Sequence, residues 1–301
     1  MAIPGLYVAL ALLPVLLGLL RPLHSSNVFP FGPASDSSSP RLLLLTAHPD
    51  DETFFFGPTL TSLIPSSGVS LSPSPTHSNS VPFAFPHVYS LCFSVGNADG
   101  LGYERRRELQ DSLDVLGVAE DKRWVLDKNE FQDNITAMWN ASLIAATVYD
   151  FISDHDISII LTFDSYGVSG HPNHYSLYHG VSQLLAMPPA SFKYPLAAYS
   201  LTSKSVVTKY IGIMAPILAK LKMTFSSVLQ LTGRGTETGS PDLPVQPIFV
   251  AGIGGYYRAV LATLQHRSQR AWFRWLYMVF SQYLWVNEWE RIHATVDVKT
   301  L

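Results

Sequence analysis

The sequence predicts an α/β fold in which a mostly parallel, Rossmann-like sheet carries helices on both faces. Short apolar runs typical of buried strands alternate with longer segments whose apolar residues recur at helical spacing. Such βα alternation is typical of a parallel sheet with crossover helices. In addition, polar residues with catalytic chemistry follow two of the runs directly, at the sheet edge where α/β folds bind ligands.

The expected elements follow in chain order. The best-defined helix, 103–116, places Leu109, Leu113 and Leu116 on one face and is followed by Gly117 as a C-cap. The other expected helices are 54–63, 137–153 and 174–185. The expected strands are 41–47, 88–94, 124–126, 157–163 and 196–201.

The first cluster of polar residues is the string AHPDDE at 47–52, which follows the apolar run 42–45. His48 and Asp51 are three residues apart, close enough to bind one metal ion, which leaves Asp50 free to handle a proton. A polar turn that caps a helix is the alternative explanation of this string.

The second cluster is the string GHPNH at 170–174, which follows the apolar run 157–163. A polar turn readily explains one such cluster. It does not readily explain two clusters of potential metal ligands that each follow a strand. The pair makes a metal-assisted hydrolase the leading hypothesis.

The two strings together resemble the LmbE-like metal-dependent deacetylases. Further segments are similar to one branch, the N-acetylglucosaminyl-phosphatidylinositol de-N-acetylases of GPI-anchor biosynthesis. These segments are 92–100, 108–109, 114–117, 162–164, 167–171, HRSQ at 266–269 and WFR at 272–274. The resemblance extends from about residue 41 to about residue 292, which is most of the chain.

This resemblance implies hydrolysis of the N-acetyl group of N-acetylglucosaminyl-phosphatidylinositol, the second step of GPI-anchor biosynthesis, giving glucosaminyl-phosphatidylinositol and acetate. It implies that His48, Asp51 and His174 hold Zn²⁺ or another divalent transition metal. Asp50 is then the general base, and His171 stabilises the oxyanion or protonates the amine.

The resemblance also implies residues around the substrate. Asn97, Asp99, Arg105 and Asp133 are expected near the sugar, and Arg105 can pair with the phosphate. The alternative for Arg105 is a charged helix face over 104–108. Asp164 is expected to orient a metal-bound histidine from behind.

One position departs from the wider superfamily. Asn173 stands where many soluble members have Asp. An amide cannot raise the pKa of the neighbouring His171 by charge, so the acid role of His171 is less firmly implied than the ligand role of His174.

Composition agrees with an enzyme that meets lipid, so the expected partners are the glycolipid substrate and the bilayer. Hydrophobic residues make up 47% of the 301 residues and charged residues only 14%.

Other partners and a disulfide are not expected. The net charge of −3 does not indicate a surface that binds nucleic acid. The acidic turn after the first strand would repel a pyrophosphate, so no nucleotide cofactor is expected. With Cys92 as the lone cysteine, no intrachain disulfide forms.

The expected domain organisation has three parts. Residues 1–22 are expected to be a transmembrane anchor, 23–40 a flexible linker and 41–301 the deacetylase domain. Within that domain we expect a disordered insertion around 65–82 and an aromatic, membrane-proximal helix around 270–290. A helix that packs in the core or against a partner is the alternative for 270–290.

The expected location is the endoplasmic reticulum membrane, with a single span and the catalytic domain facing the cytosol. The apolar stretch 5–20 has no Lys or Arg before it, and Arg21 follows it, which by the positive-inside rule keeps the following domain cytosolic. A cleaved signal peptide is the alternative. Two other functions stay open: a deacetylase of a soluble amino-sugar amide, and a non-catalytic glycolipid-binding subunit.

Overall fold

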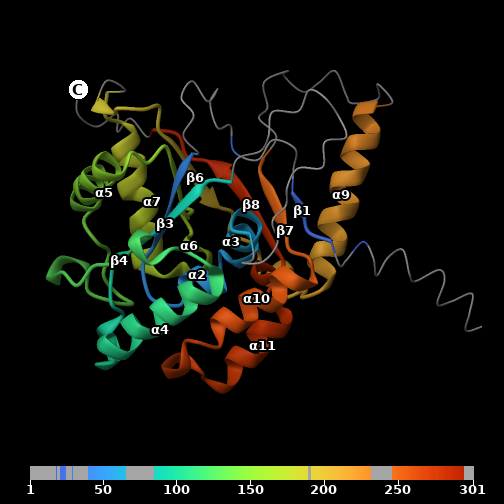
Figure 1. Ribbon diagram of the computed structural model, residues 1–301, viewed down its shortest axis with the longest axis horizontal. Helices are drawn as coiled ribbons and strands as arrows, with labels where there is room; N and C mark the ends of the chain where they lie inside the picture. Colours follow the sequence, from blue (N-terminus) through green and yellow to red (C-terminus); the bar gives the residue numbers. More distant parts are fainter. Residues whose placement is uncertain are drawn as a thin grey trace, which may run out of the picture.

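The computed structural model describes residues 18, 21–24, 29, 40–65, 85–188, 191–231 and 246–294, and its centre is one eight-stranded sheet (Figure 1). The strand order is β1-β7-β8-β6-β5-β2-β3-β4. The prediction of a mixed α/β fold with a central sheet and flanking helices is confirmed. The described strands are β1 (Leu23–His24), β2 (Arg41–Thr46), β3 (His87–Cys92), β4 (Arg123–Val125), β5 (Ile159–Phe163), β6 (Ala197–Leu201), β7 (Ile248–Val250) and β8 (Val286–Arg291).

Helices connect most of these strands. The first half of the chain holds α2 (Asp51–Phe54), α3 (Gly57–Leu63), α4 (Gly102–Leu116) and α5 (Ala141–His155). The second half holds α6 (Gly167–Gly170), α7 (Pro172–Leu185), α8 (Val206–Lys209), α9 (Met214–Leu231), α10 (Ile253–Thr263) and α11 (Trp272–Phe280). Helix α7 packs against β5 and β2 and is covered by α5, whereas α3 packs against β7 and β8 and against α10 (Figure 1).

The five strands from β6 to the edge strand β4 are parallel. Strand β2 pairs in parallel with both β3 and β5, and the parallel pairing continues to β4 on one side and β6 on the other. All four leucines of β2, at positions 42–45, are at most 1% exposed. A strand buried on both faces reads as a continuous apolar run, which is why this run predicted it.

Several helix boundaries differ from the prediction because of local capping. The helix expected over 54–63 is α3, which starts three residues later, at Gly57, with Pro58 in its first turn, where proline is favoured. Helix α5 begins after Asn140, whose Oδ1 accepts a hydrogen bond from the Leu143 N–H at 3.1 Å. Helix α7 starts at Pro172, two residues earlier than expected.

The aromatic C-terminal segment is only partly helical. Helix α11 ends at Phe280, and β8 follows, pairing antiparallel with β6 and β7. Trp289 in β8 is fully buried, and its Nε1 donates to Thr59 Oγ1 at 3.0 Å. The expected helix to about residue 290 is therefore wrong in its second half, since residues 286–291 form β8, which buries Trp289 in the sheet.

Two parts of the expected linker pack against the domain. Leu23 and His24 form β1, which pairs antiparallel with β7, and the buried Phe29 ring lies 4.8 Å from that of Tyr199. Residues 25–28 and 30–39 lie outside the described residues, as do residues 66–82 of the expected insertion.

The predicted membrane topology needs correction. The expected anchor, apart from Gly18, Arg21 and Pro22, lies outside the described residues. Among the residues that the structure does describe, no helix combines the length and the apolar character needed to cross a bilayer. This finding contradicts the prediction of a single-pass protein of the endoplasmic reticulum membrane.

Candidate active site

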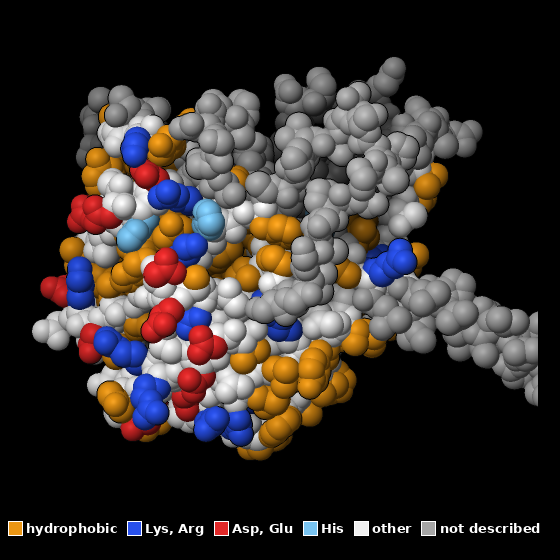
Figure 2. Space-filling model, viewed as in Figure 1, with side chains coloured by type: hydrophobic (Ala, Val, Ile, Leu, Met, Phe, Trp, Pro, Cys, Tyr) orange, Lys and Arg blue, Asp and Glu red, His pale blue; other side chains and the backbone are white. Residues whose placement is uncertain are grey.

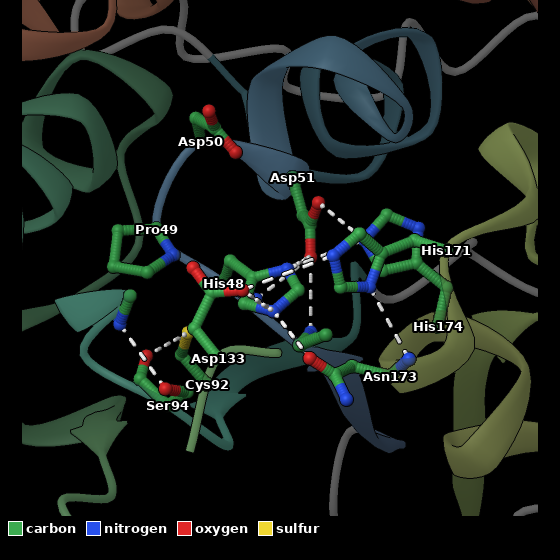
Figure 3. Close-up of polar contacts among 12 residues, drawn as sticks. His48, Pro49, Asp50, Asp51, Cys92, Ser94, Asp133, His171, Asn173 and His174 are labelled. Atoms are coloured by element: carbon green, nitrogen blue, oxygen red, sulfur yellow. Dashed lines mark hydrogen bonds and ion pairs between the residues drawn. The ribbon is translucent and has the colours of Figure 1, made fainter. Parts of the chain in front are cut away.

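The two polar clusters meet at one edge of the sheet. His48 and Asp51 follow the carboxyl end of β2, and His171 and His174 follow that of β5. Because β2 and β5 are parallel neighbours, with Leu44 opposite Leu161, the two loops leave the sheet side by side. Figure 3 shows all four side chains directed toward one another.

The loop after β2 is held in a strained conformation. Asp50 has φ 114°, a value that residues other than glycine rarely adopt and that costs about 1–3 kcal/mol. Asp51 stabilises this turn, since its Oδ2 accepts the N–H groups of Ala47 and His48 at 3.0 and 2.8 Å. The string AHPDDE is therefore a tight, buried turn.

Hydrogen bonds fix the ring of His174. Its Nδ1 lies 3.0 Å from the Gly167 carbonyl oxygen, which can only accept, so Nδ1 carries the proton. Nε2 is then left with a lone pair, and it lies 3.2 Å from Asp51 Oδ1.

The ring of His48 is fixed in the other tautomer. Its Nε2 lies 3.1 Å from Asn173 Oδ1 and 3.2 Å from Asp133 Oδ1. The Asn173 amide is itself oriented, because its Nδ2 donates to the Ala137 carbonyl at 2.9 Å while its Oδ1 accepts the Asn134 N–H at 3.1 Å. Nε2 of His48 therefore carries the proton, and the lone pair is on Nδ1.

The lone pairs of the two rings face each other. His48 Nδ1 lies 3.3 Å from His174 Nε2, and Asp51 Oδ2 lies 3.9 Å from His48 Nδ1. Two buried nitrogens and a carboxylate that all present electron pairs to one point require a cation or a proton between them. Burial opposes protonation of His48, but the hydrogen bond to Asp133 and the nearby Asp51 and Asp133 charges outweigh it, so its pKa is raised.

His171 adds a third imidazole to the cluster. The ligand atoms of His48, His171 and His174 all lie within 4.8 Å of one another. His171 caps α7, where its Nδ1 accepts the Asn173 N–H at 3.2 Å, so the proton lies on Nε2. Burial and the neighbouring His48 and His174 lower the pKa of His171 to about 4.

The pKa values of the two aspartates shift in opposite directions. Burial raises the pKa of Asp50, partly offset by Arg105. For Asp51 burial is outweighed by the charges and hydrogen bonds of His174 and His48, which hold its pKa well below the usual range. Asp50 lies apart from the three histidines (Figure 3), and its Oδ2 lies 3.4 Å from Arg274 and 3.8 Å from Arg105.

The expected substrate residues divide into two groups. Arg105 is buried and donates to the carbonyls of Gly96 and Pro49 at 2.9 and 2.8 Å. It therefore connects these two loops and does not expose a free guanidinium group. Asp133 lies inside the cluster, 3.4 Å from Arg105. Asn97 and Asp99 are exposed in a 3-10 turn, and Asn97 Oδ1 accepts the Gly102 N–H.

Asp164 lies elsewhere than expected. Its Oδ1 accepts the Ser203 hydroxyl at 2.7 Å and its Oδ2 accepts the Ser203 N–H at 2.6 Å. The Asp164 carboxylate therefore fastens the loop after β5, while the backbone carbonyl of Gly167 orients His174.

Sequence reasoning missed three residues of this region. Glu52 and His266 form a buried pair behind Asp50, and Arg274 contacts the Asp50 carboxylate. His266 and Arg274 are more than 200 positions from Asp50. The HRSQ and WFR strings that hold them had marked a resemblance without indicating a role.

Comparisons with known proteins agree on a family. Residues 82–185 match the family described as GlcNAc-PI de-N-acetylase. The N-acetylglucosaminyl-phosphatidylinositol de-N-acetylase of Bos taurus is 31% identical over 82% of this chain and 81% of its own length. The protein of the same name from Arthroderma benhamiae is also 31% identical, over 82% of this chain and 86% of its own.

Solved structures share the fold at low identity. N,N'-diacetylchitobiose deacetylase from Pyrococcus horikoshii superposes with a TM-score of 0.52 at 14% identity, covering 100% of this chain and 98% of its own. A teicoplanin deacetylase solved in a zinc-inhibited form also has a TM-score of 0.52, at 11% identity, over 85% of this chain and 99% of its own. These likenesses support the fold alone.

Proposed function

Because the chain belongs to the GlcNAc-PI de-N-acetylase family, a family of amide hydrolases, we propose that it deacetylates N-acetylglucosaminyl-phosphatidylinositol. The products are glucosaminyl-phosphatidylinositol and acetate, as in the second step of GPI-anchor biosynthesis. The observation that carries the proposal is the convergence of the His48 and His174 lone pairs on the Asp51 carboxylate.

These three residues fit a divalent metal ion. Two nitrogens bound at about 2.0–2.1 Å to one tetrahedral ion lie about 3.3–3.4 Å apart, close to the 3.3 Å between His48 Nδ1 and His174 Nε2. Two histidines and one carboxylate are a ligand set of catalytic zinc sites, and other first-row ions also accept it. When bound, the ion would polarise the acetyl carbonyl and lower the pKa of a water molecule.

Asp50 suits the role of the base. Burial raises its pKa above the ordinary value of an aspartate, which makes it a stronger base than an exposed carboxylate. In the proposed step Asp50 removes a proton from the attacking water as the new C–O bond forms. The C–N bond then breaks, and the proton passes from Asp50 to the leaving amine.

His171 suits a hydrogen-bond donor better than an acid. Its lowered pKa, about 4, keeps the ring neutral at neutral pH, with the proton on Nε2. That N–H can donate to the oxyanion that develops on the acetyl oxygen. Asp133, whose Oδ1 lies 3.8 Å from His171 Nε2, supports this orientation.

The test uses metal-replete full-length protein on three substrates: N-acetylglucosaminyl-phosphatidylinositol, its water-soluble headgroup N-acetylglucosaminyl-inositol, and free N-acetylglucosamine. Release of acetate from the first two, abolished by His174→Ala, is the expected result. Turnover of free N-acetylglucosamine at an equal or higher rate would favour a soluble amino-sugar deacetylase. Binding of the glycolipid without any acetate release would favour a non-catalytic subunit.

A further inference from the structure

Helix α11 turns an unusually apolar face outward. Six of its nine side chains are large, apolar and exposed, with Trp272 at 76% and Val279 at 56%. The others are Phe273, Trp275, Leu276 and Phe280. Figure 2 shows the hydrophobic side chains gathered over the part of the surface where α10 and α11 lie. Isolated exposed apolar residues are ordinary, but a contiguous patch of this kind marks an interaction site.

The patch continues onto the neighbouring segment. The Gly212 N–H donates to the Phe280 carbonyl at 2.8 Å, which places the loop between α8 and α9 against the end of α11. Val206, Val207 and Ile213 on that side are 75%, 79% and 50% exposed. We call this combined surface of α8, α11 and the start of α9 the apolar ledge.

The segments that form the apolar ledge carry no acidic residue. The sequence contains no Asp or Glu over 165–236, nor over 243–287, which together supply all of the ledge. Two basic residues, Arg267 and Arg270, are exposed just before α11, and Ser268 between them donates to Glu108 of α4. Exposed Trp, Phe and Leu with bordering Lys and Arg are the composition of helices that lie in the interface of an anionic bilayer.

The inner side of the same helix reaches the candidate active site. Arg274 lies 3.4 Å from Asp50 Oδ2 and packs over the Phe54 ring, while Tyr277 OH donates to the Phe54 carbonyl at 2.7 Å. One helix thickness, about 10 Å, therefore separates the exposed face from the proposed base. An interfacial helix buries its apolar face about 5–10 Å deep, which would bring the site to the level of the lipid headgroups.

We propose that the apolar ledge docks onto an anionic lipid surface and so presents the active site to a headgroup that stays in the bilayer. This inference deepens the proposed function and rests on it for the identity of the substrate. The contact is made at the surface and requires no segment that crosses the membrane. The charge pattern favours an anionic bilayer over a second copy of the chain, whose own ledge would carry the same positive charge.

The first arm of the test measures docking without using activity. Full-length protein is mixed with phosphatidylcholine–phosphatidylinositol vesicles whose acyl chains carry bromine, which quenches tryptophan at contact. Quenching is expected in the parent protein and is expected to disappear in Trp272→Phe/Trp275→Phe, which keeps the face apolar and still floats with the vesicles. Equal quenching in both proteins, or none in the parent, overturns the proposal.

The second arm compares two forms of the substrate. Trp272→Ser/Leu276→Ser/Val279→Ser is expected to lose roughly tenfold or more of the activity on vesicle-borne N-acetylglucosaminyl-phosphatidylinositol, because three large side chains no longer enter lipid. Its activity on the water-soluble headgroup is expected to be unchanged. Leu143→Ser/Tyr194→Ser, which changes exposed residues away from the ledge, is the matched control.

The outcomes separate the two proposals. If the parent turns over neither substrate, the proposed function fails, yet the quenching arm still decides on docking. Equal losses of the serine variant on both substrates contradict lipid docking. A serine variant that turns a dimer into a monomer in light scattering assigns the ledge to a second copy and also overturns the proposal.

Discussion

His266 Nε2 and Glu52 Oε1 lie 2.6 Å apart, and the two residues are only 1% and 0% exposed. Glu52 Oε1 also accepts the Ser112 hydroxyl at 2.5 Å, and Oε2 accepts the Asp50 N–H at 3.1 Å. The pair therefore joins the C-terminal part of the chain to the backbone of the strained Asp50. Through it, a segment far from the first motif helps to hold the conformation of the proposed base.

Replacing His266 should destabilise the fold. His266→Ala leaves the Glu52 carboxylate buried without its main partner, which typically costs about 3–5 kcal/mol. The free energy of unfolding in urea measures this, with the exposed neighbour change Arg267→Ala as a control. A loss no larger than that of the control would show that the pair contributes little.

The same pair should make stability depend on pH. Burial lowers the pKa of His266, but the charge and hydrogen bond of Glu52 outweigh it, so the folded pKa is raised above 6.5. A group with a raised folded pKa contributes its full stability below the unfolded value and loses it as the pH rises through the folded value. The stability difference between parent and His266→Ala should therefore shrink on the alkaline side of pH 6.5. A difference that grows with pH would contradict the assignment.

Removing a proposed ligand should remove the metal. His48→Ala, Asp51→Ala and His174→Ala each delete one of the three converging groups, so bound metal and activity should both be lost. Elemental analysis of purified protein measures the metal content. Tyr194→Ser is the control for loss of metal during purification. A variant that keeps stoichiometric metal takes that residue off the ligand set, and His171 would be the next candidate.

Changing the proposed base should separate metal binding from turnover. Asp50→Asn is suited to this, because Asn also tolerates the left-handed backbone that Asp50 adopts. The variant should keep its metal and lose about 10²–10⁴-fold in kcat, the usual contribution of a general base. Near-normal turnover would assign Asp50 to the structure of the loop alone.

Asn173 should act on the metal through His48. Its Oδ1 accepts from His48 Nε2 and so leaves Nδ1 free to bind. Asn173→Leu should weaken metal affinity by about 10–100-fold, whereas Asn173→Asp keeps an acceptor and should retain most of it. Titration with a competing chelator compares the two. Equal effects of both changes would mean that packing, and not the orientation of His48, is what Asn173 provides.

The sequence by itself determined the elements whose signals are local. The continuous leucine run of β2 predicted a strand buried on both faces, and parallel pairing then required the clusters after β2 and β5 to share an edge. Gly117 marked the end of α4, where it adopts φ 75°. His48, Asp51, His171 and His174 were therefore found together as expected.

Only the tertiary structure decided the partners of these residues. The sequence left Arg105 either as a partner of the substrate phosphate or as part of a charged helix face, yet folding buries it between two loop carbonyls. The tautomer of His48 depends on Asn173 and Asp133, and the conformation of Asp50 depends on Glu52, His266 and Arg274. No sequence period links residues so far apart. Hydrophobic periodicity reports which face of an element is buried, while the choice of a hydrogen-bond partner depends on positions in space that only the packed chain defines.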